Sequence, residues 1–220
     1  MPATRRYGQG CGTAHALDLV GDRWSLLLVR ELVLGPKRFT DLRGGLPGIG
    51  PNVLSQRLKE LEEVGVLQRR LLPPPAASTV YELTDWGREL EEVIVQLGRW
   101  GARSPTMPRD AETQPDWLVL GMRAIYDPDA EPVPTVYEFH FADEVFWARV
   151  ADGSFKVGRG EASEPDAVLT ADVETVAKLM RGELKPAAAL RSGAVRLDGD
   201  RAALDRFPAL FGFPPSAGTS

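Results

Sequence analysis

The sequence predicts an α+β protein of two units, a helical unit with a two-stranded hairpin and then an antiparallel sheet with helices on one side. Apolar residues recur at helical spacing through 14–103. From residue 135 onward, short runs of alternating apolar side chains are separated by turns, as is typical of strands. A polar, proline-bearing segment, SPTMPRDAETQP, stands between these patterns. The predicted domains are therefore 1–103 and 116–215, joined by a linker over 104–115.

The first unit is predicted to hold several amphipathic helices and one hairpin. Its apolar residues recur at three- and four-residue spacing, the pattern of a helix with one buried face. Thr40 and Thr84 stand at N-cap positions, and Pro51 suits a first helical turn. The predicted helices lie over 14–20, 22–34, 40–46, 51–64 and 84–103. Two strand-like runs, 66–72 and 79–83, flank the loop PPPAAS and predict the hairpin.

The second unit is predicted to hold one sheet and a set of short helices. Asp172 suits the N-cap of one helix, and Pro186 suits the first turn of another. The predicted helices lie over 117–125, 172–181 and 186–192 and from Asp200, and the predicted strands lie over 135–141, 144–150, 154–160, 166–171 and 194–199. Runs of strands with helices gathered after them indicate an α+β domain.

The charge of the chain is unevenly divided between its halves. The net charge is −5, but residues 1–109 hold 15 Lys and Arg against 12 Asp and Glu, a balance of +3. Residues 110–220 hold 11 against 19, a balance of −8. The acidity therefore belongs to the second half, and the first half remains suited to a polyanionic partner such as DNA.

Several classes of function are disfavoured by what the sequence lacks. Its one cysteine, Cys11, has no partner for an internal disulfide, and two histidines, His15 and His140, are too few for a zinc cluster. With no G-x-S-x-G, P-loop or H-E-x-x-H motif, we expect no enzyme, no metal and no cofactor. With no run of about 18 apolar residues and no signal segment, we expect a cytoplasmic protein with no membrane partner.

The stretch 51–64, PNVLSQRLKELEEV, predicts a helix with two different faces. Its apolar residues are spaced to anchor the helix on its domain, and they are Val53, Leu54, Leu58 and Leu61. The polar residues near its start are Asn52, Ser55, Gln56, Arg57 and Lys59, and the acids near its end are Glu60, Glu62 and Glu63. Taken alone, such a helix is better explained by a polar face that is simply solvated, since solvated faces are common.

The order of elements favours a more specific interpretation. A winged helix-turn-helix has the same order: a helix, a short helix, a tight turn, a second helix and a hairpin. The helix after the turn is the recognition helix, and its first turns enter the major groove of DNA. Amide, hydroxyl and basic side chains suit base edges and phosphates there. The residues predicted to read bases are Asn52, Ser55, Gln56, Arg57 and Lys59, and the phosphate contacts are Lys37, Arg38, Arg43, Arg69 and Arg70.

The first unit also resembles a known family. The motifs DRWSLLLVREL, GPKRFTDL, VLSQRLKELEEVGVL and YELTDWGREL, within residues 11–101, are similar to those of HxlR-type bacterial regulators, relatives of the MarR type. The resemblance implies a homodimer that binds double-stranded operator DNA. It also implies that the N-terminal helices and the helix over 84–103 form much of the dimer interface, in agreement with their long apolar stripes.

Two features of the chain bear on what this resemblance implies. The wing of such regulators usually carries charged or polar residues at its tip, whereas PPPAAS has no charge, so Arg69 and Arg70 are favoured over the tip as DNA contacts. Cys11 falls where members of the family commonly have a cysteine, which in some is a redox switch. A small buried apolar role for Cys11 is the alternative.

The second unit is similar to the sterol carrier protein two family, chiefly through the run DAVLTADVETVAKLMRGELKPAAALRSGAVRLDGDRAALDRF. The resemblance covers about residues 116–213 and implies a sheet with helices laid over it and an apolar small molecule or lipid bound between the layers. The candidate lining residues are Trp117, Met122, Tyr126, Phe139, Phe141, Phe146, Val176, Met180, Leu190, Phe207 and Phe211. An aromatic stripe at strand spacing is also what a filled core requires.

Three hypotheses follow for the whole chain. The first is a homodimeric, sequence-specific DNA-binding regulator whose second domain senses an apolar small molecule. The second is a constitutive or Cys11-dependent redox-responsive regulator whose second domain is structural or docks a protein. The third is a lipid-carrying protein with a vestigial winged domain, and the intact polar face of the helix over 51–64 speaks against it.

Overall fold

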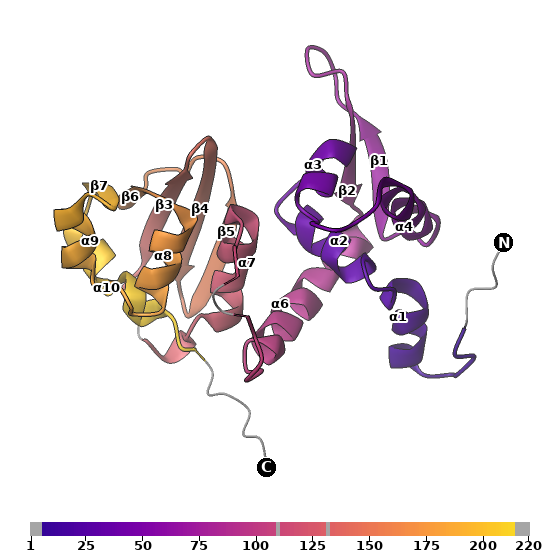
Figure 1. Ribbon diagram of the computed structural model, residues 1–220, viewed down its shortest axis with the longest axis horizontal. Helices are drawn as coiled ribbons and strands as arrows, with labels where there is room; N and C mark the ends of the chain where they lie inside the picture. The colour runs from indigo at the N-terminus through magenta and orange to yellow at the C-terminus, as the bar shows by residue number, and fades with distance from the viewer. Residues whose placement is uncertain (1–5, 109–110, 131–132, 214–220) are drawn as a thin grey trace. The chain divides into compact units, whose positions relative to one another are not determined.

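The computed structural model describes residues 6–108, 111–130 and 133–213 (Figure 1). The chain divides into two compact units, Met1–Ile94 and Val95–Ser220. The first is mostly helical with one hairpin, and the second holds a five-stranded sheet and helices, so the predicted α+β class is confirmed. The predicted domain bounds stay a prediction, and residues 1–5, 109–110, 131–132 and 214–215 within them lie outside the described residues.

The first unit follows the predicted order of elements. Before the hairpin come α1 (Gly12–Val20), α2 (Ser25–Val33), α3 (Phe39–Gly44) and α4 (Pro51–Glu63). The hairpin is β1 (Leu67–Leu71) and β2 (Thr79–Leu83), and α5 (Asp85–Arg88) and α6 (Leu90–Gly101) follow it. Pro51 opens α4, and the Thr84 hydroxyl accepts a hydrogen bond from the Gly87 N–H at 3.0 Å, as expected of an N-cap.

Two helix boundaries differ from the prediction. Arg38, not Thr40, is the N-cap of α3, because the Asp41 carboxylate accepts from the Arg38 N–H at 3.0 Å and satisfies the helix start. The helix predicted over 84–103 is divided at Glu89 and ends at Gly101. Gly87 allows α5 to approach the backbone of Val66 closely, since a Cβ on it would stand 1.9 Å from the Val66 carbonyl oxygen.

Leucine side chains from α2, α3 and α4 form the centre of the first unit's core. Leu54, Leu58 and Leu61 of α4 are buried there, and each contributes about 2 kcal/mol by leaving water. Val53, predicted as a fourth anchor, is instead 42% exposed. It lies one residue before Leu54 and therefore about 100° round the helix from that anchor, on the side that faces solvent.

The second unit combines one sheet with four helices and two 3-10 turns among the described residues. Its helices are α7 (Pro115–Ile125), α8 (Val173–Met180), α9 (Pro186–Ser192) and α10 (Arg201–Arg206), with 3-10 turns η1 (Pro128–Ala130) and η2 (Phe207–Leu210). Its strands are β3 (Thr135–Phe141), β4 (Glu144–Ala151), β5 (Ser154–Arg159), β6 (Ala167–Ala171) and β7 (Val195–Gly199). The Asp172 side chain caps α8 by accepting from the Thr175 N–H at 2.6 Å.

The sheet has the strand order β5-β4-β3-β6-β7 and is mixed, whereas the prediction was an antiparallel sheet. The pairs β3–β4, β4–β5 and β6–β7 are antiparallel, and β3–β6 is parallel. β6 is parallel to β3 because of the connecting segment 160–166. This segment starts at the end of β5 and runs back along the sheet to the N-terminal end of β3. There the Asp166 N–H donates to the Val136 carbonyl at 2.8 Å, so β6 starts beside Val136 and runs alongside β3.

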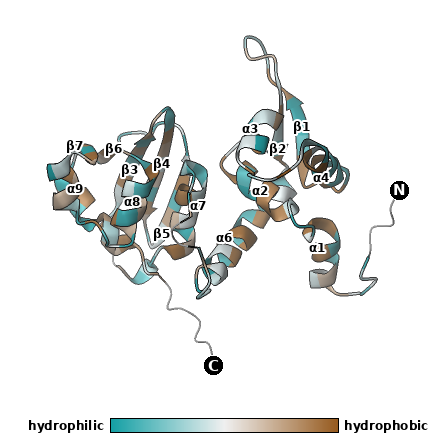
Figure 2. Cartoon of the chain, viewed as in Figure 1, coloured by the Kyte–Doolittle hydropathy of each residue, from teal (hydrophilic) through white to brown (hydrophobic). Residues whose placement is uncertain are grey.

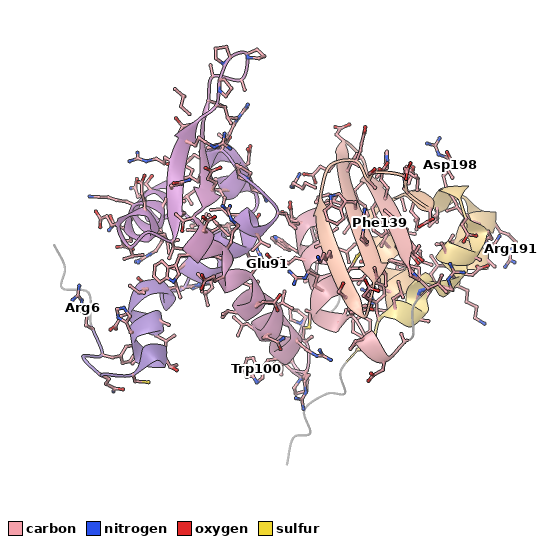
Figure 3. All side chains as sticks on the ribbon, turned by 180° about the vertical axis from the view of Figure 1, so that it is seen from behind. Arg6, Glu91, Trp100, Phe139, Arg191 and Asp198 are labelled. Carbon is pink, nitrogen blue, oxygen red and sulfur yellow. The ribbon has the colours of Figure 1, made fainter. Side chains whose placement is uncertain are left out.

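Buried and more exposed side chains alternate along the strands, so the sheet has one buried face and one open face. Tyr137, Phe139 and Phe141 of β3 point to the buried face together with Phe146 and Ala148 of β4. Helix α8 lies over the sheet in Figure 1, and the reverse view in Figure 3 shows the strands uncovered by helices. The predicted gathering of helices on one side of the sheet therefore agrees with the structure.

Among the described residues, no helix combines the length and the apolar character needed to cross a membrane.

Candidate functional site

Helix α4 presents a rigid polar surface. Three buried leucines fix its inner face, and Gly48, with a φ of 88°, lies in the turn that leads into it. Asn52, Ser55, Gln56 and Lys59 are exposed on its outer side, as predicted. Figure 2 shows hydrophilic colour on α4 and on β1, which follows it. The structure thus brings most of the predicted base-reading residues onto one helix surface.

Val53 shares this exposed surface, although the sequence pattern assigned it to the core. The signal that could have separated Val53 from the leucines is its position beside Leu54, because adjacent residues do not face the same way on a helix.

Arg57 is the least exposed of the predicted reading residues. Its side chain is 23% exposed and its Nη1 is ion-paired with both Asp22, before α2, and Glu60, one turn later on α4. Gln56 Nε2 also donates to Glu60, at 2.6 Å. Glu60 therefore holds two of the predicted reading side chains at once, and Arg57 joins α4 to the start of α2.

Strand β1 of the hairpin carries two of the predicted phosphate contacts, and one of them reaches α4. Arg69 Nε donates to Glu62 of α4 at 2.9 Å, and Arg70 Nε donates to Glu82 of β2 at 2.9 Å. These carboxylates raise the pKa of both guanidinium groups, mainly through the hydrogen bonds. In return, the hydrogen bond from Arg70 lowers the pKa of Glu82 below its ordinary value of 4.5. Both arginines are exposed and keep their charge.

Lys37 occupies a different place from the other predicted phosphate contacts. Its side chain is 11% exposed, and Nζ lies 2.8 Å from Oε2 of Glu31, which is 1% exposed. Arg30 Nη2 lies 2.8 Å from the other oxygen of the same carboxylate. The lysine backbone also pairs with Tyr81 of β2. The structure therefore gives Lys37 a buried pairing role and leaves its predicted phosphate contact untested.

The remaining predicted phosphate contacts and the wing tip lie at the surface. Arg38 and Arg43, at the start and in the last turn of α3, are exposed. The tip of the hairpin is exposed over 73–77 and carries no charge. Figure 1 shows it projecting beyond the strands. Whether Arg69 and Arg70 of β1 meet phosphates in preference to the tip stays a prediction.

Helix α6 has two apolar sides. Leu90 and Ile94 pack on the core of the first unit. Val93, Leu97 and Trp100 are exposed, the last by 73%, and Figure 3 shows Trp100 projecting from the helix. Their spacing of four and three residues places them in one stripe. The apolar stripe predicted for this helix is therefore divided between a packed side and an exposed side.

The predicted lining residues of the second unit form its core. Met122, Tyr126, Phe139, Phe141, Phe146, Val176, Met180, Phe207 and Phe211 are buried, and Trp117 and Leu190 are half-buried. The rings contact each other, with centroids 5.6 Å apart for Phe139 and Phe207 and 5.1 Å apart for Phe207 and Phe211. The structure brings these side chains together, as predicted, in close packing. Whether they line a ligand site stays a prediction.

A small pocket of about 80 Å³ lies beside this core. Its lining residues are Ala130, Val133, Thr135, Tyr137, Arg206, Ala209 and Leu210. None of these belongs to the predicted lining set. The Tyr137 hydroxyl donates to the Ala203 carbonyl at 3.0 Å, and burial raises the pKa of Tyr137 to about 12. This tyrosine is a neutral structural group at physiological pH.

Cys11 is exposed and stands at the N-cap position of α1. The nearby backbone N–H groups of Ala14 and then Thr13 lower the pKa of its thiol below the ordinary value of 9.0. A thiolate at a helix start is favoured by the same N–H groups. Among the described residues, no cluster of three or more His, Cys, Asp or Glu side chains could hold a metal ion.

Comparison with known proteins accounts for both units. The HxlR-like helix-turn-helix model matches residues 19–107, and the SCP-2 sterol transfer family model matches residues 120–212. A solved structure of the redox regulator HypR in its oxidized form is 33% identical to this chain, with a TM-score of 0.39, and the match covers 41% of this chain and 94% of that one.

Two relatives from Bacillus subtilis (strain 168) match the first unit. YvaP, an uncharacterised HTH-type transcriptional regulator, is 38% identical over 85 residues, which are 39% of this chain and 79% of that protein. YdeP, of the same description, is 36% identical over 95 residues, 43% of this chain and 74% of its own length. The chain therefore belongs to the HxlR-like helix-turn-helix family of DNA-binding transcriptional regulators and carries an SCP-2-like domain after that unit.

Proposed function

We propose that this protein is a homodimeric, cytoplasmic, sequence-specific transcriptional regulator that acts by binding and catalyses no reaction. The observation that carries the proposal is the exposed polar surface at the start of α4, held on a leucine core and followed by two exposed arginines on β1. In the proposed complex, the first turns of α4 enter the major groove of an operator.

Different side chains of α4 are proposed to contact different groups of the DNA. Asn52 and Gln56 offer amides suited to adenine, and Arg57 offers a guanidinium suited to guanine. Ser55 and Lys59 suit bases or phosphates, and Val53 adds an apolar contact for a thymine methyl group. On binding, Arg57 and Gln56 exchange Glu60 for a base edge. Breaking the contacts of Glu60 with Arg57 and Gln56 therefore reduces the net free energy of DNA binding.

Basic side chains around α4 are proposed to supply the part of the DNA affinity that does not depend on base sequence. Arg38, Arg43, Arg69 and Arg70 are exposed and would neutralise phosphates, with release of counterions from the duplex. Lys37 is kept as a weaker candidate, since its ammonium group lies against Glu31. The expected consequence is an affinity that falls steeply as salt rises.

The proposed dimer is formed by α1 and α6 of two copies. The exposed stripe Val93, Leu97 and Trp100 is apolar, and Leu17 adds an exposed apolar side chain on α1. Exposed apolar side chains at helical spacing suit burial against a second copy in a two-fold interface. A dimer would present two α4 helices to half-sites about 34 Å apart on the duplex.

For the second unit, we propose an apolar small-molecule effector that enters between the sheet and its helices. Support comes from the match to the SCP-2 sterol transfer family and from the concentration of aromatic side chains there. Because these rings contact each other, the ligand has to separate α8, η2 or α7 from β3 and β4. It then shifts the regulator only by its difference in affinity between the closed and opened forms.

The recognition helix is tested by selecting operators from a random DNA library with the full chain and measuring affinity by fluorescence anisotropy. N52A and Q56A are expected to weaken binding to the selected operator about 5- to 100-fold each, since a good base contact is worth about 1–3 kcal/mol. Q9A removes an exposed amide far from α4 in the sequence and is expected to bind as wild type does. Selection of no preferred sequence, or equal loss in Q9A, contradicts the proposal.

A second candidate function is redox regulation through Cys11, and it has its own observation: an exposed thiol with a lowered pKa at the start of α1. Oxidation there would alter the helix proposed to form part of the dimer. The test compares operator affinity of wild type and C11S with and without diamide. Loss of affinity in oxidised wild type alone supports the switch, and equal affinity in all four samples excludes it.

A further inference from the structure

The open face of the second unit's sheet carries a groove of about 370 Å³. Its lining residues are Val136, Trp147, Arg149, Lys156, Glu161, Ala162 and Ser163. The strand residues among them alternate with the buried aromatic residues of β3 and β4, so they point to the opposite side of the sheet. The groove is thus separate from the core in which an apolar effector is proposed. We propose that it binds a small planar aromatic carboxylate.

The floor of the groove is an indole ring laid flat on a neighbouring strand. Trp147 of β4 pairs with Gly158 of β5, and a Cβ on Gly158 would stand 2.6 Å from Cε2 and Cζ2 of the indole. Gly158 has an ordinary backbone conformation, so the ring and not the chain geometry requires glycine there. A flat, half-buried indole offers one face to a stacking partner.

One wall is the connecting segment 160–166, which is fixed at several points along its length. The Gly160 N–H donates to the Val145 carbonyl at 2.8 Å, and the Asp166 carboxylate accepts from the Val136 N–H at 2.7 Å. Between them, the Ala162 N–H donates to Oε2 of the buried Glu138 at 2.7 Å. The wall is therefore held by the sheet itself, which gives the groove a preformed shape.

Two cationic side chains in the groove favour an anionic ligand. Arg149 and Lys156 stand directly opposite each other on β4 and β5, and like charges in that position are destabilising. Among the described residues, neither side chain has a carboxylate within ion-pairing distance, and both are exposed. Glu161 at the rim carries the opposing sign, so the lining has a net charge of +1. A carboxylate between the two cations would relieve their repulsion.

Trp147 and the cation pair lie two residues apart on the same face of β4, about 7 Å along the strand. That separation fits a ligand whose ring rests on the indole while its carboxylate reaches Arg149 and Lys156. The volume lies near the lower end of the range for small-molecule sites. The ring and the charge are both needed, so a neutral aromatic compound or a non-aromatic acid should bind weakly.

The test uses the full chain and 2-naphthoate as the probe, with isothermal titration calorimetry. Wild type is expected to bind one 2-naphthoate per chain, at least tenfold more tightly than 2-naphthalenemethanol or cyclohexanecarboxylate. R149Q and W147L should each lose at least tenfold in affinity. R196Q removes an exposed arginine from β7, outside the groove, and should stay within twofold of wild type.

K156E separates a local loss of binding from a general loss of structure. It converts the like-charge pair into an opposite-charge pair, so the free protein should unfold at the same or a higher temperature while 2-naphthoate affinity falls at least tenfold. Three results overturn the proposal. They are no saturable binding of 2-naphthoate at millimolar concentration, equal binding of the neutral alcohol, or unchanged affinity in R149Q and K156E.

Discussion

Glu60 accepts a hydrogen bond from Gln56 Nε2 at 2.6 Å and is ion-paired with Arg57, on the same helix. One acidic side chain therefore occupies two groups that are proposed to read bases. In the free protein it orients both side chains and neutralises the arginine. On DNA, the carboxylate comes close to the duplex, where its charge opposes binding.

Replacing Glu60 with glutamine is expected to tighten DNA binding about 2- to 5-fold. The variant removes a partly exposed ion pair, of Arg57 with Glu60, worth roughly 0.2–1 kcal/mol, so this pair no longer has to be broken when DNA binds. Affinity for the selected operator and for random duplex should be measured by fluorescence anisotropy across a salt series. E89Q carries the same charge change in the turn between α5 and α6 and should bind as wild type. Weaker binding by E60Q would instead show that Glu60 mainly positions its partners.

A charge placed in the exposed stripe of α6 is expected to break the proposed dimer. L97D buries a carboxylate among apolar side chains if two copies associate there, at a cost of several kcal/mol. Sedimentation velocity should then shift from dimer to monomer, and operator affinity should fall more than affinity for a single half-site. L71E introduces an acid at an exposed leucine of β1 and should leave the dimer intact. A dimer of L97D as stable as wild type contradicts the assignment.

Removing the Lys37 ammonium group is expected to destabilise the first unit. K37M leaves Glu31, which is 1% exposed, with Arg30 as its main counter-ion, and the loss should be about 3 kcal/mol. Urea unfolding followed by circular dichroism measures it. The double variant K37M/E31Q should recover part of the loss, because the buried charge is gone. R43M, at an exposed site, should change the free energy of unfolding by less than about 0.5 kcal/mol.

The pKa of Glu82 reports the ion pair across the hairpin. Because the hydrogen bond from Arg70 is the largest cause that lowers it, R70A should raise this pKa toward 4.5. Q68A removes a smaller cause and should raise it less. Carboxyl-detected NMR titration measures both changes.

The lowered pKa of Glu82 also predicts how the stability of the folded protein changes with pH. A carboxyl with a lowered pKa in the folded state contributes stability that is present above its unfolded value and lost as the pH falls through the folded value. Wild type should therefore lose stability more steeply than R70A below about pH 4.5. Identical acid unfolding curves would show that the pair contributes nothing.

Much of the first unit was predictable from the sequence because its signals are local. The spacing of Leu54, Leu58 and Leu61 requires a buried face, Pro51 begins the helix, and Thr84 caps the next one, and each is confirmed. Thr40 failed as a cap because α3 begins before it, at Phe39, where the Asp41 carboxylate accepts from the N–H of the N-cap residue Arg38. Val53 failed as an anchor because helix spacing alone does not fix which neighbour of a buried residue turns outward.

The sequence by itself determined the two-unit α+β plan, the polar start of the recognition helix and the alternation of faces in the later strands. The tertiary structure alone decided how charges are paired, since Glu31 with Lys37 and Arg57 with Asp22 join segments that no local pattern relates. It also decided that β6 runs parallel to β3 and that Arg149 stands opposite Lys156. Periodicity fixes which side of an element is buried, whereas pairing and register depend on where the chain returns in space.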